Sequence, residues 1–304
     1  MLSEKEKIKL ENAGFRIIGN HSAIKTCEWT RKALRGDGFC YKQKFYGIQS
    51  HRCLQFTPSL QFCTHKCLFC WRDTSITSSR WKGPIDDPKF ILEEAIKKHR
   101  EILQGFKGNP KVDLKKFQEA LYPNQIAISL AGEPTMYPKL PELIDETKKI
   151  GMTSFLVTNG TFPNMLKKIL SHPPTQLYIT LPAPDEKIYK KTCMPIIKNG
   201  WKRIKKSLSM IKNFRKKCRT VIRLTLVKDL NFIYPEKYAE IIEEANPEYV
   251  EVKSFMSVGF SRSRLPYSKM PLHEEIRKFS EEIEKHSNYK IVDEKKDSRV
   301  VLLK

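Results

Sequence analysis

Three cysteines at positions 63, 67 and 70 are the residues best suited to chemistry in this chain. They stand in the run CTHKCLFC, and with 8 cysteines among 304 residues chance would give this spacing on the order of 0.005 times per chain. Three thiolates can hold three irons of a four-iron cluster and leave the fourth iron open. A zinc site completed by His65 is the alternative, although His65 sits between two of the cysteines, where sharing one metal is awkward.

A second set of cysteines lies upstream, where Cys27, Cys40 and Cys53 are separated by two equal steps of thirteen residues. Three thiolates could again bind a cluster there, while three unrelated buried cysteines are the alternative, because gaps of thirteen residues impose no local geometry. Lys42 stands two residues after Cys40. A lysine whose pKa is lowered by its surroundings has a free amine that can form a Schiff base with a carbonyl substrate.

The chain is strongly basic, with 56 Lys and Arg against 34 Asp and Glu and a net charge of +22. A polyanion is the natural partner, and we favour a nucleic acid over an acidic small substrate or a membrane surface. The basic residues gather at Lys202, Arg203, Lys205 and Lys206, and at Arg215, Lys216, Lys217 and Arg219. Each cluster alone also fits a solvated helix face, so the prediction of a polyanionic partner rests on the net charge of the whole chain.

Composition predicts a soluble globular protein, since 40% of the residues are hydrophobic and no apolar run approaches the roughly 18 residues that cross a bilayer. The charged N-terminus lacks an apolar signal segment, which predicts a cytoplasmic protein. In that reducing compartment, eight cysteines indicate metal or redox chemistry in place of disulfides. Cys193 and Cys218 stand apart from the others and are predicted to be ordinary buried thiols.

Short apolar runs alternate with amphipathic stretches from about residue 53 onward, which is typical of βα units. Six strands are predicted, over residues 53–58, 126–131, 154–158, 177–181, 221–227 and 249–255. Six helices are predicted, over residues 88–103, 140–149, 164–170, 201–217, 235–245 and 272–286. Such units build a parallel sheet with functional groups at the carboxyl ends of the strands, and six are too few for a complete eight-fold barrel.

The cysteine loop directly after the first strand resembles that of the radical S-adenosylmethionine (radical-SAM) enzymes. Phe69 occupies the aromatic position that packs near the adenine in that family. Gly132 and Glu133 belong to a run AGEP that resembles the family's GGEP turn, which holds the methionine ammonium, with Ala in place of the first Gly. Thr158 and Asn159 end the third strand with groups suited to ribose or carboxylate contacts, although a capped turn would look the same.

The resemblance implies an α/β fold, an incomplete (βα)6 TIM-like barrel of the radical-SAM type over residues 53–288. Residues 1–52 would form an N-terminal extension that carries part of a second iron–sulfur site, and residues 289–304 a C-terminal β-like tail packed on the barrel. In such enzymes an electron from the reduced cluster splits S-adenosylmethionine, and the resulting 5′-deoxyadenosyl radical removes a hydrogen from the substrate.

The upstream cysteines, the cysteine loop and the run at residues 252–265 together resemble the 4-demethylwyosine synthases of tRNA wybutosine biosynthesis. These are radical-SAM carbon–carbon lyases that condense pyruvate carbons with N1-methylguanosine next to the anticodon of tRNA-Phe. The resemblance implies two [4Fe-4S] clusters and S-adenosyl-L-methionine as cofactors, and tRNA, pyruvate and an unidentified electron donor as partners. It assigns Cys63, Cys67 and Cys70 to the SAM cluster, Cys27, Cys40 and Cys53 to the second cluster, and Lys42 to the Schiff base.

Arg262 and Arg264 follow the sixth strand in a loop rich in Ser and Gly, and we expect them to contact the tRNA at the rim of the barrel. Two other functions stay open from the sequence. One is another two-cluster radical-SAM tRNA modifier, such as a methylthiotransferase. The other is a non-catalytic RNA-binding protein with structural zinc, which metal analysis would distinguish from an iron enzyme.

Overall fold

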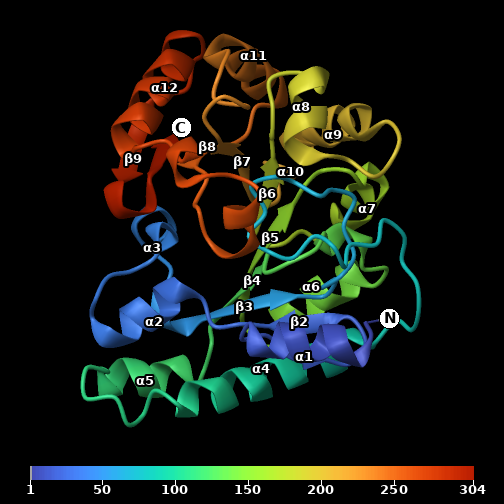
Figure 1. The fold of residues 1–304 in the computed structure, drawn as a ribbon, viewed down its shortest axis with the longest axis vertical. Helices are drawn as coiled ribbons and strands as arrows, with labels where there is room; N and C mark the ends of the chain where they lie inside the picture. Colours follow the sequence, from blue (N-terminus) through green and yellow to red (C-terminus); the bar gives the residue numbers. More distant parts are fainter. Residues whose placement is uncertain (1) are drawn as a thin grey trace. The chain divides into compact units, whose positions relative to one another are not determined.

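A computed structural model describes residues 2–304 of the chain, and Figure 1 shows the course of its helices and strands. The residues divide into two compact units. Unit 1 contains the chain up to Phe62 together with Arg80–Val157 and Ser171–Thr175. Unit 2 contains Cys63–Ser79, Thr158–Leu170 and Gln176–Lys304. These units cut across the predicted segments 1–52, 53–288 and 289–304, and that three-part division stays a prediction.

The parallel strands follow the sequence prediction closely. Unit 1 contains β3 (Cys53–Thr57), β4 (Gln125–Ile128) and all of β5 (Thr153–Thr158) except its last residue, which belongs to unit 2. Unit 2 contains β6 (Gln176–Thr180), β7 (Arg219–Leu226) and β8 (Tyr249–Ser254). Within each unit the three strands pair in parallel, in chain order. All six predicted strands are confirmed. Most of their side chains are buried on both faces, as expected where crossover helices cover a parallel sheet.

Unit 1 begins with elements that the sequence reading did not predict. They are α1 (Glu4–Asn12), the hairpin of β1 (Arg16–Ile18) and β2 (Ser22–Ile24), α2 (Glu28–Arg35), α3 (Tyr41–Tyr46) and η1 (Ser50–Arg52). A capping box between Ser3 and Glu6 begins α1. Strand β2 pairs antiparallel with β3 and so extends the sheet of unit 1.

The helices of unit 1 lie against this sheet. They are α4 (Pro88–Gln104), α5 (Leu114–Ala120), the short η2 (Pro134–Met136) and α6 (Leu140–Lys149). Helix α4 passes along β1, β2 and β3 and also contacts α6 (Figure 1). The sequence prediction is confirmed for α4 and α6, whereas α5 was not predicted.

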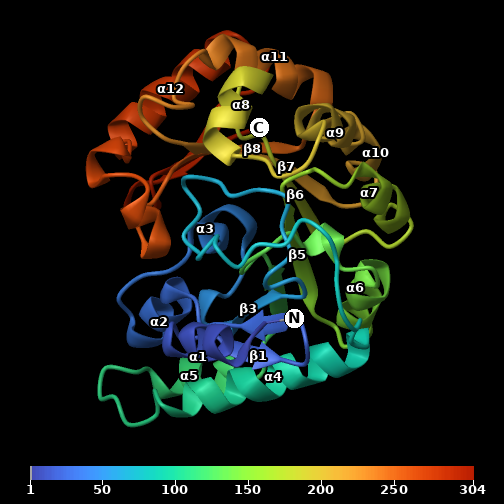
Figure 2. The ribbon, with the colours of Figure 1, turned by 45° about the vertical axis from the view of Figure 1, so that its right-hand side comes forward.

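Unit 2 contains α7 (Pro163–Ile169), α8 (Glu186–Cys193), α9 (Gly200–Leu208), α10 (Ile211–Phe214), α11 (Pro235–Ala245) and α12 (His273–Lys285). The prediction of one helix over residues 201–217 is wrong, because the helix ends at Leu208 and a separate turn, α10, follows. Helices α11 and α12 lie side by side in both views (Figure 2).

The C-terminal residues extend the sheet of unit 2. Strand β10 (Val300–Leu303) pairs antiparallel with β8, and β9 (Ile291–Lys295) pairs with β10. Three short helices complete the unit: η3 (Gly259–Ser263), η4 (Tyr267–Lys269) and η5 (Lys296–Ser298). Over residues 2–304, none of the helices combines the length and the apolar character that a membrane crossing requires.

Candidate iron–sulfur and nucleotide site

The segment with Cys63, Cys67 and Cys70, residues 63–74, has no helix or strand and is called the cluster loop here. Residues 192–196 hold its first half through main-chain hydrogen bonds, since the N–H of Lys66 donates to the carbonyl of Cys193 at 3.1 Å. The N–H of Ile196 donates to the carbonyl of Thr64 at 2.9 Å. A loop whose main-chain groups are paired in this way keeps its cysteines in a fixed arrangement.

Two polar side chains lie beside the sulfurs of the cluster loop. Arg72 is buried, with 6% of its surface exposed; burial opposes its charge, but the sulfurs of Cys63, Cys70 and Cys67 outweigh it and raise the pKa of the guanidinium. Burial raises the pKa of Cys70, and Arg72 offsets part of this effect. The amide Nδ2 of Asn159 lies 3.8 Å from Cys63 Sγ.

These surroundings fit an iron–sulfur cluster. Three cysteines share one loop, a buried cation balances the negative charge of thiolates, and an amide N–H points at a sulfur, which are the features that stabilise such clusters. All eight cysteines of the chain are free thiols, so none of them is committed to a disulfide.

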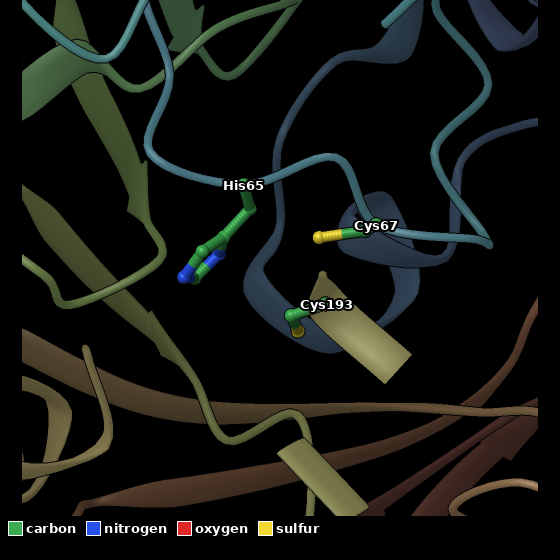
Figure 3. A group of neighbouring side chains, drawn as sticks. All are labelled: His65, Cys67 and Cys193. Atoms are coloured by element: carbon green, nitrogen blue, oxygen red, sulfur yellow. The ribbon is translucent and has the colours of Figure 1, made fainter. Parts of the chain in front are cut away.

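A fourth thiol lies beside the cluster loop. Cys193 ends α8, and its sulfur, that of Cys67 and a ring nitrogen of His65 all lie within 4.8 Å of one another (Figure 3). A hydrogen bond with Cys193, together with burial, raises the pKa of Cys67 well above its usual value. The prediction that Cys193 is a buried thiol is confirmed, but its position next to Cys67 was not predicted.

His65 is held as a neutral imidazole. Its Nε2 lies 2.8 Å from the hydroxyl of Tyr189, and burial, with a smaller effect of Arg72, lowers the pKa of His65 to about 3. A neutral imidazole and two thiols are also donors that zinc accepts. Zinc would therefore find three donors here, His65, Cys67 and Cys193. This set differs from the one that the sequence suggested, which was the three cysteines of the loop with His65.

Arg264 reaches the second half of the cluster loop. Its guanidinium donates to the carbonyl of Leu68 at 3.2 Å, to the carbonyl of Cys70 and, at 3.4 Å, to the carbonyl of Arg72. Arg262 is exposed, and its Nε donates to the carbonyl of Ser257 at 3.0 Å. The tRNA contacts proposed for both arginines stay predictions, and Arg264 in addition has a structural role that the sequence did not predict.

The residues suggested for the nucleotide have defined places. The hydroxyl of Thr158 accepts the N–H of Gly160 at 3.0 Å, and Nδ2 of Asn159 donates to Thr64 Oγ1 at 3.0 Å. Asn159 thus connects the end of β5 with the cluster loop within unit 2. Phe69 packs against an apolar cluster that includes Phe255.

The turn with Gly132 and Glu133, in unit 1, is tightly built. Gly132 has φ +67°, and a Cβ there would lie 1.8 Å from the carbonyl oxygen of Ser59, so only glycine fits. The N–H of Glu133 donates to the carbonyl of Phe62 at 2.7 Å, and its carboxylate, on a side chain that is 1% exposed, accepts the N–H of Thr135 at 3.0 Å. A buried carboxylate beside a narrow turn suits an ammonium ligand.

The upstream cysteines also come together, within unit 1. Cys27 and Cys40 are the N-cap residues of α2 and α3, and Cys53 begins β3. Burial raises the pKa of Cys27, and Cys53 raises it further, while Lys42 lowers it. Burial likewise raises the pKa of Cys53, with Lys42 opposing and Cys40 adding to the effect. Cys53 thus lies within electrostatic reach of both Cys27 and Cys40, and Lys42 lies within reach of Cys27 and Cys53.

Lys42 lies on the first turn of α3, with its Nζ 5.1 Å from the centre of the Phe155 ring, a side chain that is 3% exposed. The aromatic face holds the amine by a cation–π contact. The sequence pattern pointed to Lys42 but not to the places of Phe155, Arg72 and Cys193, because contacts between distant segments leave no local pattern.

Comparisons with known proteins agree with this geometry. The profile of the radical SAM superfamily matches residues 57–242, and the profile described as wyosine base formation matches residues 244–304. A solved structure described as TYW1 with a lysine-pyruvate adduct bound is 40% identical, with a TM-score of 0.89 over 100% of this chain and 96% of that chain. The predicted incomplete barrel of the radical-SAM type is therefore confirmed, as is the enzyme class.

Among curated proteins, the S-adenosyl-L-methionine-dependent tRNA 4-demethylwyosine synthase of Pyrococcus abyssi is 50% identical over 95% of this chain and 85% of the relative. The Homo sapiens protein of the same description, TYW1, is 39% identical over 97% of this chain and 40% of that longer protein. Identity at this level, spread along almost the whole chain, places it in the radical-SAM superfamily and, within that superfamily, in the tRNA 4-demethylwyosine synthase family.

Proposed function

We propose that this protein condenses pyruvate carbons with N1-methylguanosine next to the anticodon of tRNA-Phe and so forms 4-demethylwyosine. The family is one of S-adenosylmethionine-dependent tRNA-modifying enzymes, which excludes the non-catalytic zinc protein and favours this reaction over that of a methylthiotransferase. The observation that carries the proposal is the convergence of Cys27, Cys40 and Cys53 with Lys42.

The lysine supplies the chemistry for pyruvate. The Nζ of Lys42 attacks the ketone carbon, the carbonyl oxygen leaves as water, and a C=N bond joins the lysine to the substrate. A structural relative is described with a lysine-pyruvate adduct bound, which supports a lysine in this role. The aromatic ring of Phe155 under the amine limits where Lys42 can move, so the adduct would form in one place.

The radical-SAM family implies S-adenosylmethionine and a [4Fe-4S] cluster, which when bound supply the 5′-deoxyadenosyl radical that takes a hydrogen from the N1-methyl group. We assign Cys63, Cys67 and Cys70 as ligands of this cluster. Arg72 balances their charge, and Asn159 orients Cys63.

We assign the amino acid end of S-adenosylmethionine to the turn of Gly132 and Glu133, whose carboxylate attracts the ammonium. Thr158 and Asn159 contribute polar contacts to the nucleoside, and Phe69 an aromatic contact to the adenine. A second [4Fe-4S] cluster held by Cys27, Cys40 and Cys53 would bind pyruvate.

The overall reaction is tested by mass spectrometry of tRNA that contains N1-methylguanosine. The tRNA is incubated without oxygen with the reconstituted, chemically reduced protein, S-adenosylmethionine and pyruvate. A tricyclic product that contains pyruvate carbon from a ¹³C label supports the proposal. Unmodified N1-methylguanosine in a preparation that does cleave S-adenosylmethionine would refute it.

The lysine is tested by trapping. Borohydride should reduce the C=N bond and fix ¹⁴C-pyruvate on the wild-type chain, whereas the Lys42→Ala variant should stay unlabelled. Lys44→Ala is the matched control, because Lys44 lies two residues further along α3 and should be dispensable for labelling. Label that persists in the Lys42→Ala variant would remove that lysine from the mechanism.

The number of clusters is tested by metal analysis. The wild-type protein should bind about eight irons with equal sulfide, and a variant with Cys27, Cys40 and Cys53 all changed to Ala about four. A wild-type value of four irons would eliminate the second cluster.

A further inference from the structure

One stretch of the chain has no acidic residue at all. Residues 187–228 contain fifteen Lys and Arg and no Asp or Glu, so this seventh of the chain carries most of the net charge of +22. It spans most of α8, all of α9 and α10, and strand β7 in unit 2. Three of the fifteen pair with acidic residues outside the stretch: Lys190 with Glu186, Arg223 with Glu251 and Lys228 with Glu275. The remaining excess of positive charge favours a polyanionic partner.

Helix α9 presents this charge to solvent. Its apolar side chains, including Trp201 and Ile204, are buried, and the side chains that remain exposed are all basic. These are Lys202, Arg203, Lys205 and Lys206. In the described part of the chain, none of the four forms a salt bridge, whereas exposed lysines on other helices do, such as Lys285 with Glu282 at 2.6 Å.

A pocket of about 390 Å³ opens beside these cations. One wall is the start of α7 and the residues before it, including Thr161 and Asn164, and the other wall is α9 with the preceding Asn199. Lys202, Arg203 and Lys206 line it, and no acidic residue does. The pocket is therefore concave, lined by hydrogen-bond donors and cations, and suited to a phosphate group.

This pocket lies close to the chemistry of unit 2. Thr161 lines it and also exchanges a hydrogen bond of 2.9 Å with Thr64 of the cluster loop. A second hollow, lined among others by Lys66 and Lys198, shares Asn199 with the first. Glu186 also lines the second hollow, where it pairs with Lys190 at 2.8 Å. The two hollows thus adjoin beside the cluster loop, and we call the cations along them the α9 track and define it by Lys198, Lys202, Arg203 and Lys206.

We propose that the α9 track binds the phosphodiester backbone of the tRNA strand that carries the target base, with one phosphate in the pocket between α7 and α9. The proposal rests on the proposed function, since it takes tRNA as the substrate. RNA is favoured over an acidic protein because the site is a hollow with several cations converging on one small space, which matches a phosphate better than carboxylates spread over a protein surface.

The test compares two variants with the same change in charge. Lys202→Glu/Lys206→Glu reverses two cations one helical turn apart on α9. Lys278→Glu/Lys290→Glu is the control, with two exposed lysines on and after α12, which lies well apart from α9 in both views (Figures 1 and 2). Binding of N1-methylguanosine tRNA is measured over a series of salt concentrations with reconstituted protein.

We expect the α9 variant to bind tRNA about tenfold or more weakly and to lose about two from the slope of log Kd against log salt, because each phosphate contact contributes roughly one. In the control variant the slope should change by no more than about one. A neutral variant, Lys202→Gln/Lys206→Gln, should lie between the two. Cleavage of S-adenosylmethionine without tRNA should be unchanged in all of them, which shows that the cluster and fold are intact.

The failures of the two proposals differ. If wild-type protein does not bind tRNA, both the proposed function and the α9 track are overturned. If wild-type protein binds and the α9 variant behaves as the control does, only the track is overturned. The α9 track is also overturned as a tRNA site if the α9 variant binds tRNA normally but is reduced more slowly by an acidic electron-donor protein. That result would make this surface a protein-docking site.

Discussion

Replacing Arg264 by Ala should loosen the cluster loop. The guanidinium donates to the carbonyls of Leu68, Cys70 and Arg72, which lie in a segment without helix or strand. Removing the side chain leaves these carbonyls without that donor, which destabilises the closed arrangement of the loop.

The size of the effect follows from the two best bonds, those to Leu68 and Cys70. A hydrogen bond from a charged donor contributes about 1.5–3 kcal/mol, and the lower end applies because Arg264 is partly exposed. Two such bonds give about 3 kcal/mol, which is about a hundredfold in the equilibrium between the closed and open loop. Lysine at this position keeps the charge but not the fork of donors, so Arg264→Lys should recover only part of the loss.

Hydrogen exchange read by mass spectrometry measures this equilibrium on protein without metal. Peptides covering residues 64–74 should exchange about a hundredfold faster in Arg264→Ala than in the wild type, while peptides from α12 should not change. Arg262→Ala is the matched control, because Arg262 donates to Ser257 outside the loop. Equal protection of residues 64–74 in Arg264→Ala and wild-type protein would refute the structural role of Arg264.

Three further changes have defined outcomes. Burial lowers the pKa of His99 to about 4, from 6.5 in the unfolded chain. The free energy of unfolding, measured by urea titration, should therefore fall by about 3 kcal/mol through this group as the pH drops from 7 to 4. The His99→Leu variant should lack this contribution. Gly132→Ala should cost at least about 3 kcal/mol in the same titrations, because its Cβ meets a carbonyl oxygen, whereas Gly151→Ala, with positive φ but open space, should cost about 1 kcal/mol. Cys193→Ala should lower the melting temperature more than Cys218→Ala does and leave the iron content unchanged, and a loss of iron would make Cys193 a ligand.

The sequence was sufficient for the regular part of the fold. The six parallel strands start within two residues of their predicted positions, and α6 and α11 have the predicted bounds, because periodicity, proline and glycine mark these elements locally. The helix predicted over residues 201–217 fails at Ser209, since no proline or glycine interrupts residues 201–217 to announce the bend. Helix α8 carried a signal that could have been used, namely Asp185, whose side chain caps it.

The residues of the candidate site, too, were predictable only where they lie close together in the sequence. Spacing alone identified Cys63, Cys67 and Cys70 as a group, because ligands on one short loop leave a pattern in the sequence. Cys193 leaves none, since it reaches Cys67 through pairing of the cluster loop with residues 192–196, more than a hundred residues away. Contacts of this kind depend on tertiary structure, which no local periodicity records.

The C-terminal segment, residues 244–304, explains how the cluster loop can be irregular and still ordered. This segment is matched by the wyosine base formation profile, and within unit 2 it supplies both Arg264 and the N–H of Phe260, which donates to the carbonyl of Trp71 at 2.9 Å. A Cβ on the neighbouring Gly259 would lie 2.4 Å from that same carbonyl, so the approach requires glycine. Because main-chain carbonyls of a loop must find donors, the segment matched by the wyosine base formation profile also completes the hydrogen bonding of the cluster loop in this chain. Substitutions of Gly259 or Arg264 should therefore alter the stability of the cluster loop, whereas Arg262→Ala should not.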